Sequence, residues 1–133
     1  MDTSEKVLLL GGLLSLSYGF LLGLPLASAR MVAPSASRHL VTAHLAAIIQ
    51  GAMLLALTRA AAVSTLPQAA ETAGAALLVT GCTLFAGGAI INWRQQIDDH
   101  FAVRSMGWRM LAASGPLNIG GLSVFIVGTV MAL

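Results

Sequence analysis

Four apolar runs divide the chain, and each is long enough to cross the hydrocarbon core of a membrane. They cover approximately residues 7–28, 40–62, 69–93 and 110–133. A transmembrane helix needs about 20 apolar residues, and lipid offers no hydrogen-bond partner to a free backbone group. Membrane-spanning strands would show an apolar alternation over about ten residues, which none of the runs has. The pattern predicts an all-α, integral membrane bundle of four transmembrane helices, formed by residues 1–133 as a single domain.

Composition supports this class. Only 9% of the residues are charged and 57% are hydrophobic, whereas about a quarter of the residues of a soluble domain carry a charge. So few charges could not cover the surface of the protein in water. The seven basic residues are scattered at the ends of the runs rather than gathered into a patch, so the expected partner is the lipid bilayer and no nucleic acid.

The first apolar run has one feature of a signal peptide, since Ala27-Ser28-Ala29 resembles a signal-peptidase cleavage site. Asp2 and Glu5 precede the run, and its length exceeds the usual signal-peptide core of about 7–15 residues. We therefore expect it to remain as the first helix. The one cysteine, Cys82, lies among small residues in the third run, where packing is its expected role.

The distribution of lysine and arginine predicts the orientation in the membrane. Five of the seven flank the first and third connections, and only Lys6 and Arg59 flank the other side. The positive-inside rule then places the two longer loops in the cytoplasm and both termini outside. We expect a multi-pass protein of the inner (cytoplasmic) membrane.

Glycine spacing predicts close helix packing. Gly19 and Gly23 form a GxxxG pair in the first run, and glycines recur every seven residues in the third and fourth runs (Gly74, Gly81, Gly88, Gly121 and Gly128). Small residues on one stripe allow two helix backbones to approach closely. The stripe predicts a tight bundle. Self-association of the chain is also plausible, because a four-helix membrane protein this small has little room inside one chain for a ligand.

Polar side chains at membrane depth are costly and usually face a bundle interior, a partner or a ligand. Five such residues stand out: His44, Gln50, Asn92, Gln96 and Asn118. No Asp or Glu lies deep in a run, although Glu71 is close to the start of the third. This weighs against a proton-coupled transporter, which generally needs a buried carboxylate relay.

His44 has two interpretations: a neutral histidine bonded across helices, or a ligand of a metal or haem iron. No second histidine lies three or four residues away, which argues against a zinc site within one helix. His39 is five residues away, on nearly the opposite face and near the membrane edge. Gln50 differs from His44 by about 120° around the helix and about 9 Å along it. A ligand between subunits could meet His44 of one chain and Gln50 of the next.

Several segments together resemble a known family. They are residues 1–4 followed by Leu8-Leu9-Leu10-Gly11-Gly12, the pair Arg30-Met31, the segment 43–51 (AHLAAIIQG), and Asn92-Trp93. In order and spacing they are similar to the hydroxylaminobenzene mutases, small four-helix membrane enzymes that rearrange an arylhydroxylamine to an aminophenol. The histidine followed six residues later by an amide and a glycine also resembles styrene oxide isomerase, which converts an epoxide to an aldehyde.

The resemblance implies a cyclic homotrimer with haem b between subunits and a small aromatic substrate. His44 matches the axial haem histidine. Gln50 falls where the isomerase has an asparagine that helps to place the substrate, Asn92 matches an asparagine of the third helix, and Gln96 falls where the isomerase has a catalytic tyrosine. The implied function is a membrane isomerase or mutase with Gln50, Asn92 and Gln96 beside the substrate. Arg94 is a candidate partner of a haem propionate, although an arginine at a helix end commonly extends to the interface.

Other classes stay open on the sequence. A small multidrug-type transporter would also have four short helices, but it should carry a carboxylate deep in the first helix, where this chain has Ser15, Ser17 and Tyr18. A haem-binding electron-transfer subunit normally supplies two axial histidines, and His39 and His100 both lie near the boundaries. A non-catalytic haem-binding or structural subunit is a further alternative, which the changes at Gln50 and Gln96 favour.

Overall fold

The computed structural model describes residues 1–99 and 101–133. Over these residues the chain forms helices and no strands, and the four helices are α1 (Thr3–Val32), α2 (Arg38–Val63), α3 (Gln68–Arg94) and α4 (Met106–Ala132). Each helix is long and apolar enough to cross a membrane. The expected all-helical, four-helix architecture is confirmed, and four apolar helices of this kind suggest a multi-pass membrane protein.

The helices extend beyond the apolar runs. α1 begins at Thr3 rather than at residue 7, and α4 begins at Met106 rather than at residue 110. The added turns are stabilised by capping side chains. Asp2 and Glu5 form a capping box at the start of α1, and the Ser105 hydroxyl accepts a hydrogen bond from the Trp108 N–H at 3.0 Å. An apolar window finds only the part of a helix that lies in hydrocarbon, so it misses these polar ends.

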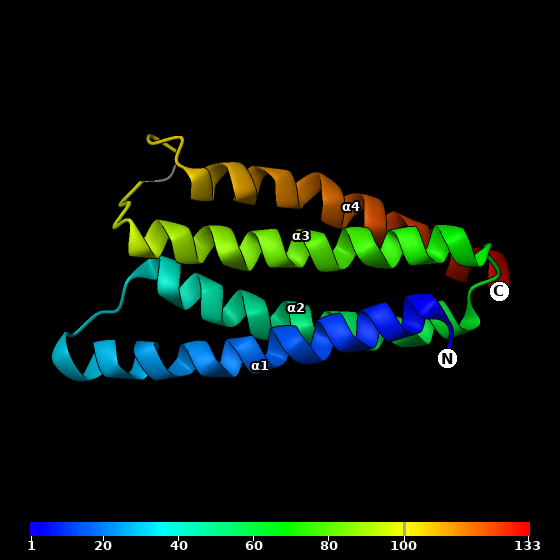
Figure 1. The fold of residues 1–133 in the computed structure, drawn as a ribbon, viewed down its shortest axis with the longest axis horizontal. Helices are drawn as coiled ribbons and strands as arrows, with labels where there is room; N and C mark the ends of the chain where they lie inside the picture. Colours follow the sequence, from blue (N-terminus) through cyan, green and yellow to red (C-terminus); the bar gives the residue numbers. More distant parts are fainter. Residues whose placement is uncertain (100) are drawn as a thin grey trace.

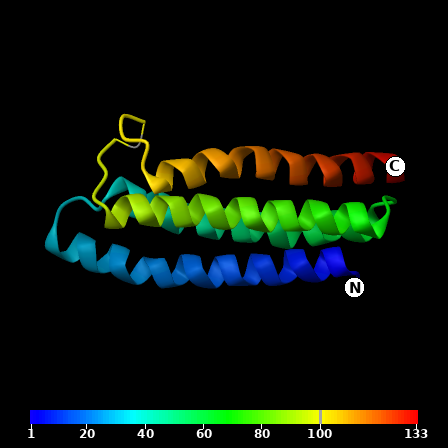
Figure 2. The same ribbon diagram turned by 45° about the horizontal axis from the view of Figure 1, so that its top comes forward.

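The helices run alternately up and down, as Figure 1 shows. α1 and α4 lie at opposite edges, and α2 and α3 lie between them in both views (Figures 1 and 2). The most extensive contacts join α3 to α4 and α1 to α2, and no close backbone contact joins α1 to α4 among the described residues. The two longer connections share one end of the molecule, and both termini lie at the other end with the α2–α3 turn (Figure 1).

Glycines lie where the helix backbones approach each other. The heptad glycines of α3 all face α4: a Cβ added to Gly74, Gly81 or Gly88 would meet Val124, Asn118 or the Gly107 carbonyl oxygen, respectively. The GxxxG pair of α1 faces α2, because a Cβ on Gly19 or Gly23 would meet Ile48 or His44. The glycine spacing therefore reports two close helix pairs within one chain.

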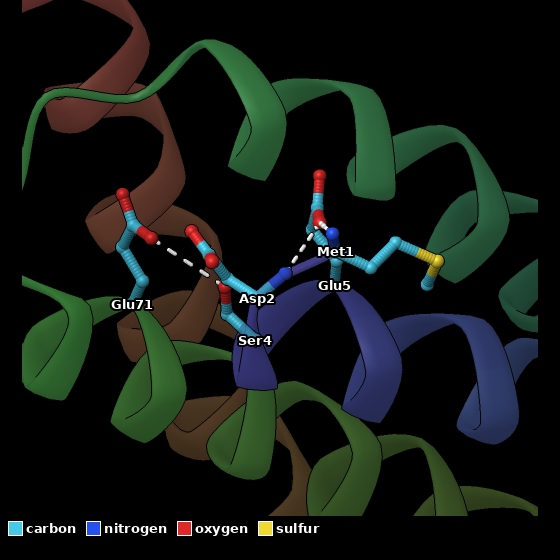
Figure 3. A network of polar contacts seen from close by, with 5 residues as sticks. All are labelled: Met1, Asp2, Ser4, Glu5 and Glu71. Carbon is cyan, nitrogen blue, oxygen red and sulfur yellow. Dashed lines mark hydrogen bonds and ion pairs between the residues drawn. The ribbon is translucent and has the colours of Figure 1, made fainter.

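A polar network ties the start of α1 to the start of α3 at the end that carries the termini (Figure 3). The Ser4 hydroxyl donates to a carboxylate oxygen of Glu71 at 3.4 Å, and the Met1 ammonium lies 3.5 Å from the carboxylate of Glu5. Ser4 is fully buried and Glu71 is only 4% exposed. A carboxyl group is thus buried between helices in the first turn of α3.

Candidate functional site

His44 packs against the GxxxG face of α1. Its Nδ1 lies 2.8 Å from the carbonyl oxygen of Gly19, and its Cε1 would lie 3.4 Å from a Cβ added to Gly23. A side chain larger than alanine at Gly23 would enter the space that the imidazole ring uses, whereas a Cβ at Gly19 would meet Ile48 and Ala47. Gly23 therefore leaves room for the ring, and the carbonyl oxygen of the buried Gly19 fixes its orientation.

The hydrogen bond to Gly19 sets the tautomer of His44. A carbonyl oxygen only accepts, so Nδ1 carries the proton and donates it to Gly19, and the lone pair of the neutral ring then resides on Nε2. No hydrogen bond in the described part of the protein engages Nε2, and the side chain is half-buried. An imidazole whose Nδ1–H is held by a backbone carbonyl while Nε2 is available is the common arrangement of a metal-ligating histidine.

Gln50 lies in the middle of α2, further along the helix than His44. Its side chain is half-buried, and its Oε1 atom is buried with no hydrogen-bond partner among the described residues. A buried amide oxygen without a partner loses its solvation without compensation, and such a group calls for an explanation. A donor from outside this chain would satisfy it.

Asn92 and Gln96 do lie together, at the end of the molecule with the two longer connections. They line a cavity of about 730 Å³ between the start of α2 and the end of α3. The other lining residues are Ser37, Arg38, His39, Trp93, Ile97 and Asp98. Asn92 lies in the last turn of α3, whereas Gln96 lies beyond the end of the helix at Arg94 and has a positive φ of 52°. The turn that follows α3, rather than a shared helix face, therefore brings both residues to one cavity.

Asn92 is fully buried and only half satisfied. Its Oδ1 accepts a hydrogen bond from the Ser105 hydroxyl at 2.6 Å, whereas its Nδ2 is buried with no partner among the described residues. Gly107 makes room for this side chain, because an added Cβ there would collide with Oδ1 of Asn92. The amide N–H₂ group is therefore a spare donor beside the cavity.

His39 is the residue that the sequence reasoning placed at the membrane edge without a role. In the structure it is 6% exposed, and its Nε2 donates to the carbonyl oxygen of Ile97 at 2.7 Å. It lines the cavity of Asn92 and also an adjoining one of about 480 Å³, whose wall includes Phe85, Phe101 and Trp108. The sequence held one signal, a histidine and an arginine side by side at the start of a transmembrane helix, but no sign of their partners.

The predicted site residues do not form one pocket within a single chain. His44 faces α1, whereas Asn92 contacts the start of α4 and shares a cavity with Gln96. Arg94 is exposed at the end of α3 and is not among the residues that line this cavity. His100, considered above as a second axial ligand, lies outside the described residues.

The described residues contain no group of three or more His, Cys, Asp or Glu side chains placed to hold a metal ion. Comparisons with protein-family models, with curated proteins and with solved structures each found no match to this chain. The chain is a small protein of four helices, each long and apolar enough to cross a membrane, with an oriented histidine between two helices and two amides at a separate cavity.

Proposed function

We propose that the protein is a membrane-embedded isomerase or mutase that rearranges a small aromatic hydroxylamine or epoxide, with His44 as the single protein ligand of a haem b iron. The observation that carries this proposal is the orientation of His44. Its Nδ1–H is held by Gly19, so Nε2 is the free basic nitrogen of a half-buried ring. His44 would hold the haem iron through Nε2, and a haem with a single histidine ligand would supply iron able to bind a substrate oxygen.

A haem that His44 ligates would lie between chains. Among the described residues, His44 does not line the cavities of about 730, 480 and 320 Å³, and its half-buried ring lies between α1 and α2, at one edge of the molecule. A second copy of the chain would provide the missing wall and would fit the cyclic homotrimer that the resemblance implies. The unpartnered Oε1 of Gln50 supports the same arrangement, since an interface would supply its donor.

The other proposed residues would act on the substrate by neutral hydrogen bonds. The spare Nδ2 donor of Asn92 and the amide of Gln96 would orient the oxygen of an epoxide or an N–O group and stabilise charge that develops there. Because these residues and His44 are separated in one chain, the complete site would combine His44 of one copy with the amides of another. When bound, the haem iron would supply a Lewis acid for the substrate oxygen.

The proposed location is the inner membrane, with both termini outside. The two longer connections share one end of the molecule (Figure 1), and five basic residues belong to that end: Arg30, Arg38, Arg94, Arg104 and Arg109. The positive-inside rule assigns this end to the cytoplasm. Arg94 is exposed at the same end, where it could reach a haem propionate or the lipid head groups.

The test is an activity assay on membranes that contain the protein, with phenylhydroxylamine and styrene oxide as substrates. His44→Ala should lower turnover about 100-fold, since even the loss of a group that supports a metal ligand typically costs about 10–100-fold. Leu45→Ala is the matched control, because Leu45 is the next residue and is 49% exposed. Turnover that survives in His44→Ala would refute the assigned role of His44.

A small proton-coupled transporter is the second candidate, and Glu71 favours it. The sequence suggested no carboxylate deep in a run, yet Glu71 is 4% exposed and is bonded only weakly to Ser4 at 3.4 Å. A buried carboxyl is the group that such a transporter would use to bind and release a proton. Proton-driven uptake that is abolished by Glu71→Gln and unaffected by His44→Ala would favour this candidate over the isomerase.

A further inference from the structure

The first turn of α2 holds the turn that ends α3. His39 donates from Nε2 to the carbonyl oxygen of Ile97 at 2.7 Å, and Arg38 donates from Nη2 to the carbonyl oxygen of Asp98. Two consecutive side chains thus engage two consecutive carbonyl groups about 60 residues further along the chain. His39 is almost fully buried, so its hydrogen bond is protected from competition by water.

The turn that they hold has the hydrogen bonds of a Schellman motif. The Ile97 N–H donates to the carbonyl of Asn92 at 3.0 Å, and the Gln96 N–H donates to the carbonyl of Trp93 at 3.1 Å. Gln96 occupies the left-handed position of this motif, with φ of 52°, and it is the one non-glycine residue with positive φ among the described residues. Glycine is the usual residue there, because a side chain is strained in that conformation.

A strained residue persists where its surroundings fix it and is a pointer to function. Gln96 is exposed and lines the cavity of about 730 Å³ together with Asn92, whose Nδ2 is buried and without a partner among the described residues. Glycine at position 96 would relieve the strain but would remove the amide from this cavity. The presence of glutamine is explained if the amide has a ligand to meet there.

We propose that Arg38 and His39 are positioning residues, which hold the amide of Gln96 beside Asn92 in this cavity and so make the first turn of α2 part of the substrate site. The inference rests on the proposed function, because the two amides would meet the substrate of that reaction. Neither Arg38 nor His39 needs to touch the substrate, since both act on the backbone of the α3 turn. The charged groups that line the cavity, Arg38 and Asp98, are of opposite sign, which fits an uncharged ligand.

Hydrogen exchange measured on the purified protein tests the clamp without any substrate. His39→Phe removes the donor to Ile97 and should raise the exchange rates of the Gln96 and Ile97 amides about tenfold. His39→Gln retains an N–H donor and should keep the exchange rates within about twofold of the wild-type values. Amides in the middle of α3 should be unchanged in both variants, which separates loosening of the turn from global unfolding.

Kinetics with phenylhydroxylamine or styrene oxide test the positioning role. His39→Phe should lower kcat/KM about tenfold, and His39→Gln should restore it to within about twofold. Gln96→Gly should raise the melting temperature by roughly 2–5 °C because strain is relieved, yet lower kcat/KM about tenfold. Gln95→Ala is the control, since Gln95 is exposed on the same turn and does not line the cavity.

Each outcome decides the proposal. Faster exchange in His39→Phe, rescue by His39→Gln and the opposed changes in Gln96→Gly would support it. Unchanged exchange in His39→Phe, or a Gln96→Gly variant with unaltered kcat/KM, would overturn it. If the wild-type protein turns over neither substrate, the proposed function fails, and the clamp is then decided by the two measurements that need no substrate. Faster exchange in His39→Phe together with a higher melting temperature of Gln96→Gly would support the clamp. An unchanged value in either measurement would overturn it.

Discussion

The adjacent glycines Gly120 and Gly121 of α4 provide a matched test of helix packing. A Cβ added to Gly121 would lie 2.6 Å from the carbonyl oxygen of Gly74 and 2.9 Å from the backbone nitrogen of Leu78, both on α3. A Cβ added to Gly120 would lie 3.8 Å from its nearest neighbour, a side-chain methyl of Leu77. The same substitution, glycine to alanine, is therefore a backbone collision at one position and an ordinary contact at the next.

The expected free-energy change follows from these distances. Ordinary van der Waals contact begins at 3.4 Å, so the Gly121→Ala methyl is about 0.8 Å too close to an oxygen that cannot rotate away. The helices must separate by a comparable distance, and a gap of about 0.5–1 Å forfeits a quarter to a half of the dispersion energy of the affected contacts. We expect Gly121→Ala to destabilise the fold by about 2–3 kcal/mol. Gly120→Ala should be neutral or stabilise it by up to about 1 kcal/mol, because alanine favours the helix.

The assay is reversible unfolding in mixed micelles of mild detergent and dodecyl sulfate, followed by circular dichroism. The midpoint of Gly121→Ala should shift to a lower mole fraction of dodecyl sulfate, and the free energies of unfolding of the two variants should differ by about 3 kcal/mol. Equal stabilities for the two variants would refute the argument that α3 and α4 are in backbone contact at Gly121.

Three further predictions concern the polar groups. Gly23→Ala should retain haem on His44, because its Cβ makes an ordinary contact at 3.4 Å, whereas Gly23→Leu should displace the ring and abolish the Soret band. Ser4→Ala should lower the free energy of unfolding by about 1 kcal/mol by removing a hydrogen bond to Glu71, and a double-mutant cycle with Glu71→Gln should show the coupling. Asn92→Leu should lower the free energy of unfolding by about 1–2 kcal/mol, because the half-buried hydroxyl of Ser105 loses its acceptor, and denaturation of the purified variant would measure the change.

The sequence was sufficient for the helices and for much of their packing. Apolar runs longer than about 20 residues leave no alternative to helices in lipid. The seven-residue spacing of Gly74, Gly81 and Gly88 indicated close helix packing, and in the structure all three glycines face α4. The ends of the helices were less predictable, because the added turns of α1 and α4 depend on capping by Asp2 and Ser105 rather than on apolar residues.

The candidate site was predictable only in part. The sequence singled out Asn92 and Gln96, and both line one cavity, but Gln96 reaches it through the turn after α3. The sequence could not show that His39 would bond to Ile97, since that contact joins residues 58 positions apart. The positive φ of Gln96 left no trace in the sequence, because glutamine gives no signal where a glycine would have marked the turn. The proton position of His44 likewise depends on a carbonyl of another helix.

The absorption spectrum of the purified protein in mild detergent, before and after dithionite, tests whether His44 holds haem. We expect a Soret band in the wild-type protein and in Leu45→Ala that shifts on reduction and is lost in His44→Ala. A preparation that stays colourless after haem is supplied during expression, or a His44→Ala variant that keeps the band, would contradict the assignment of His44 as the haem ligand.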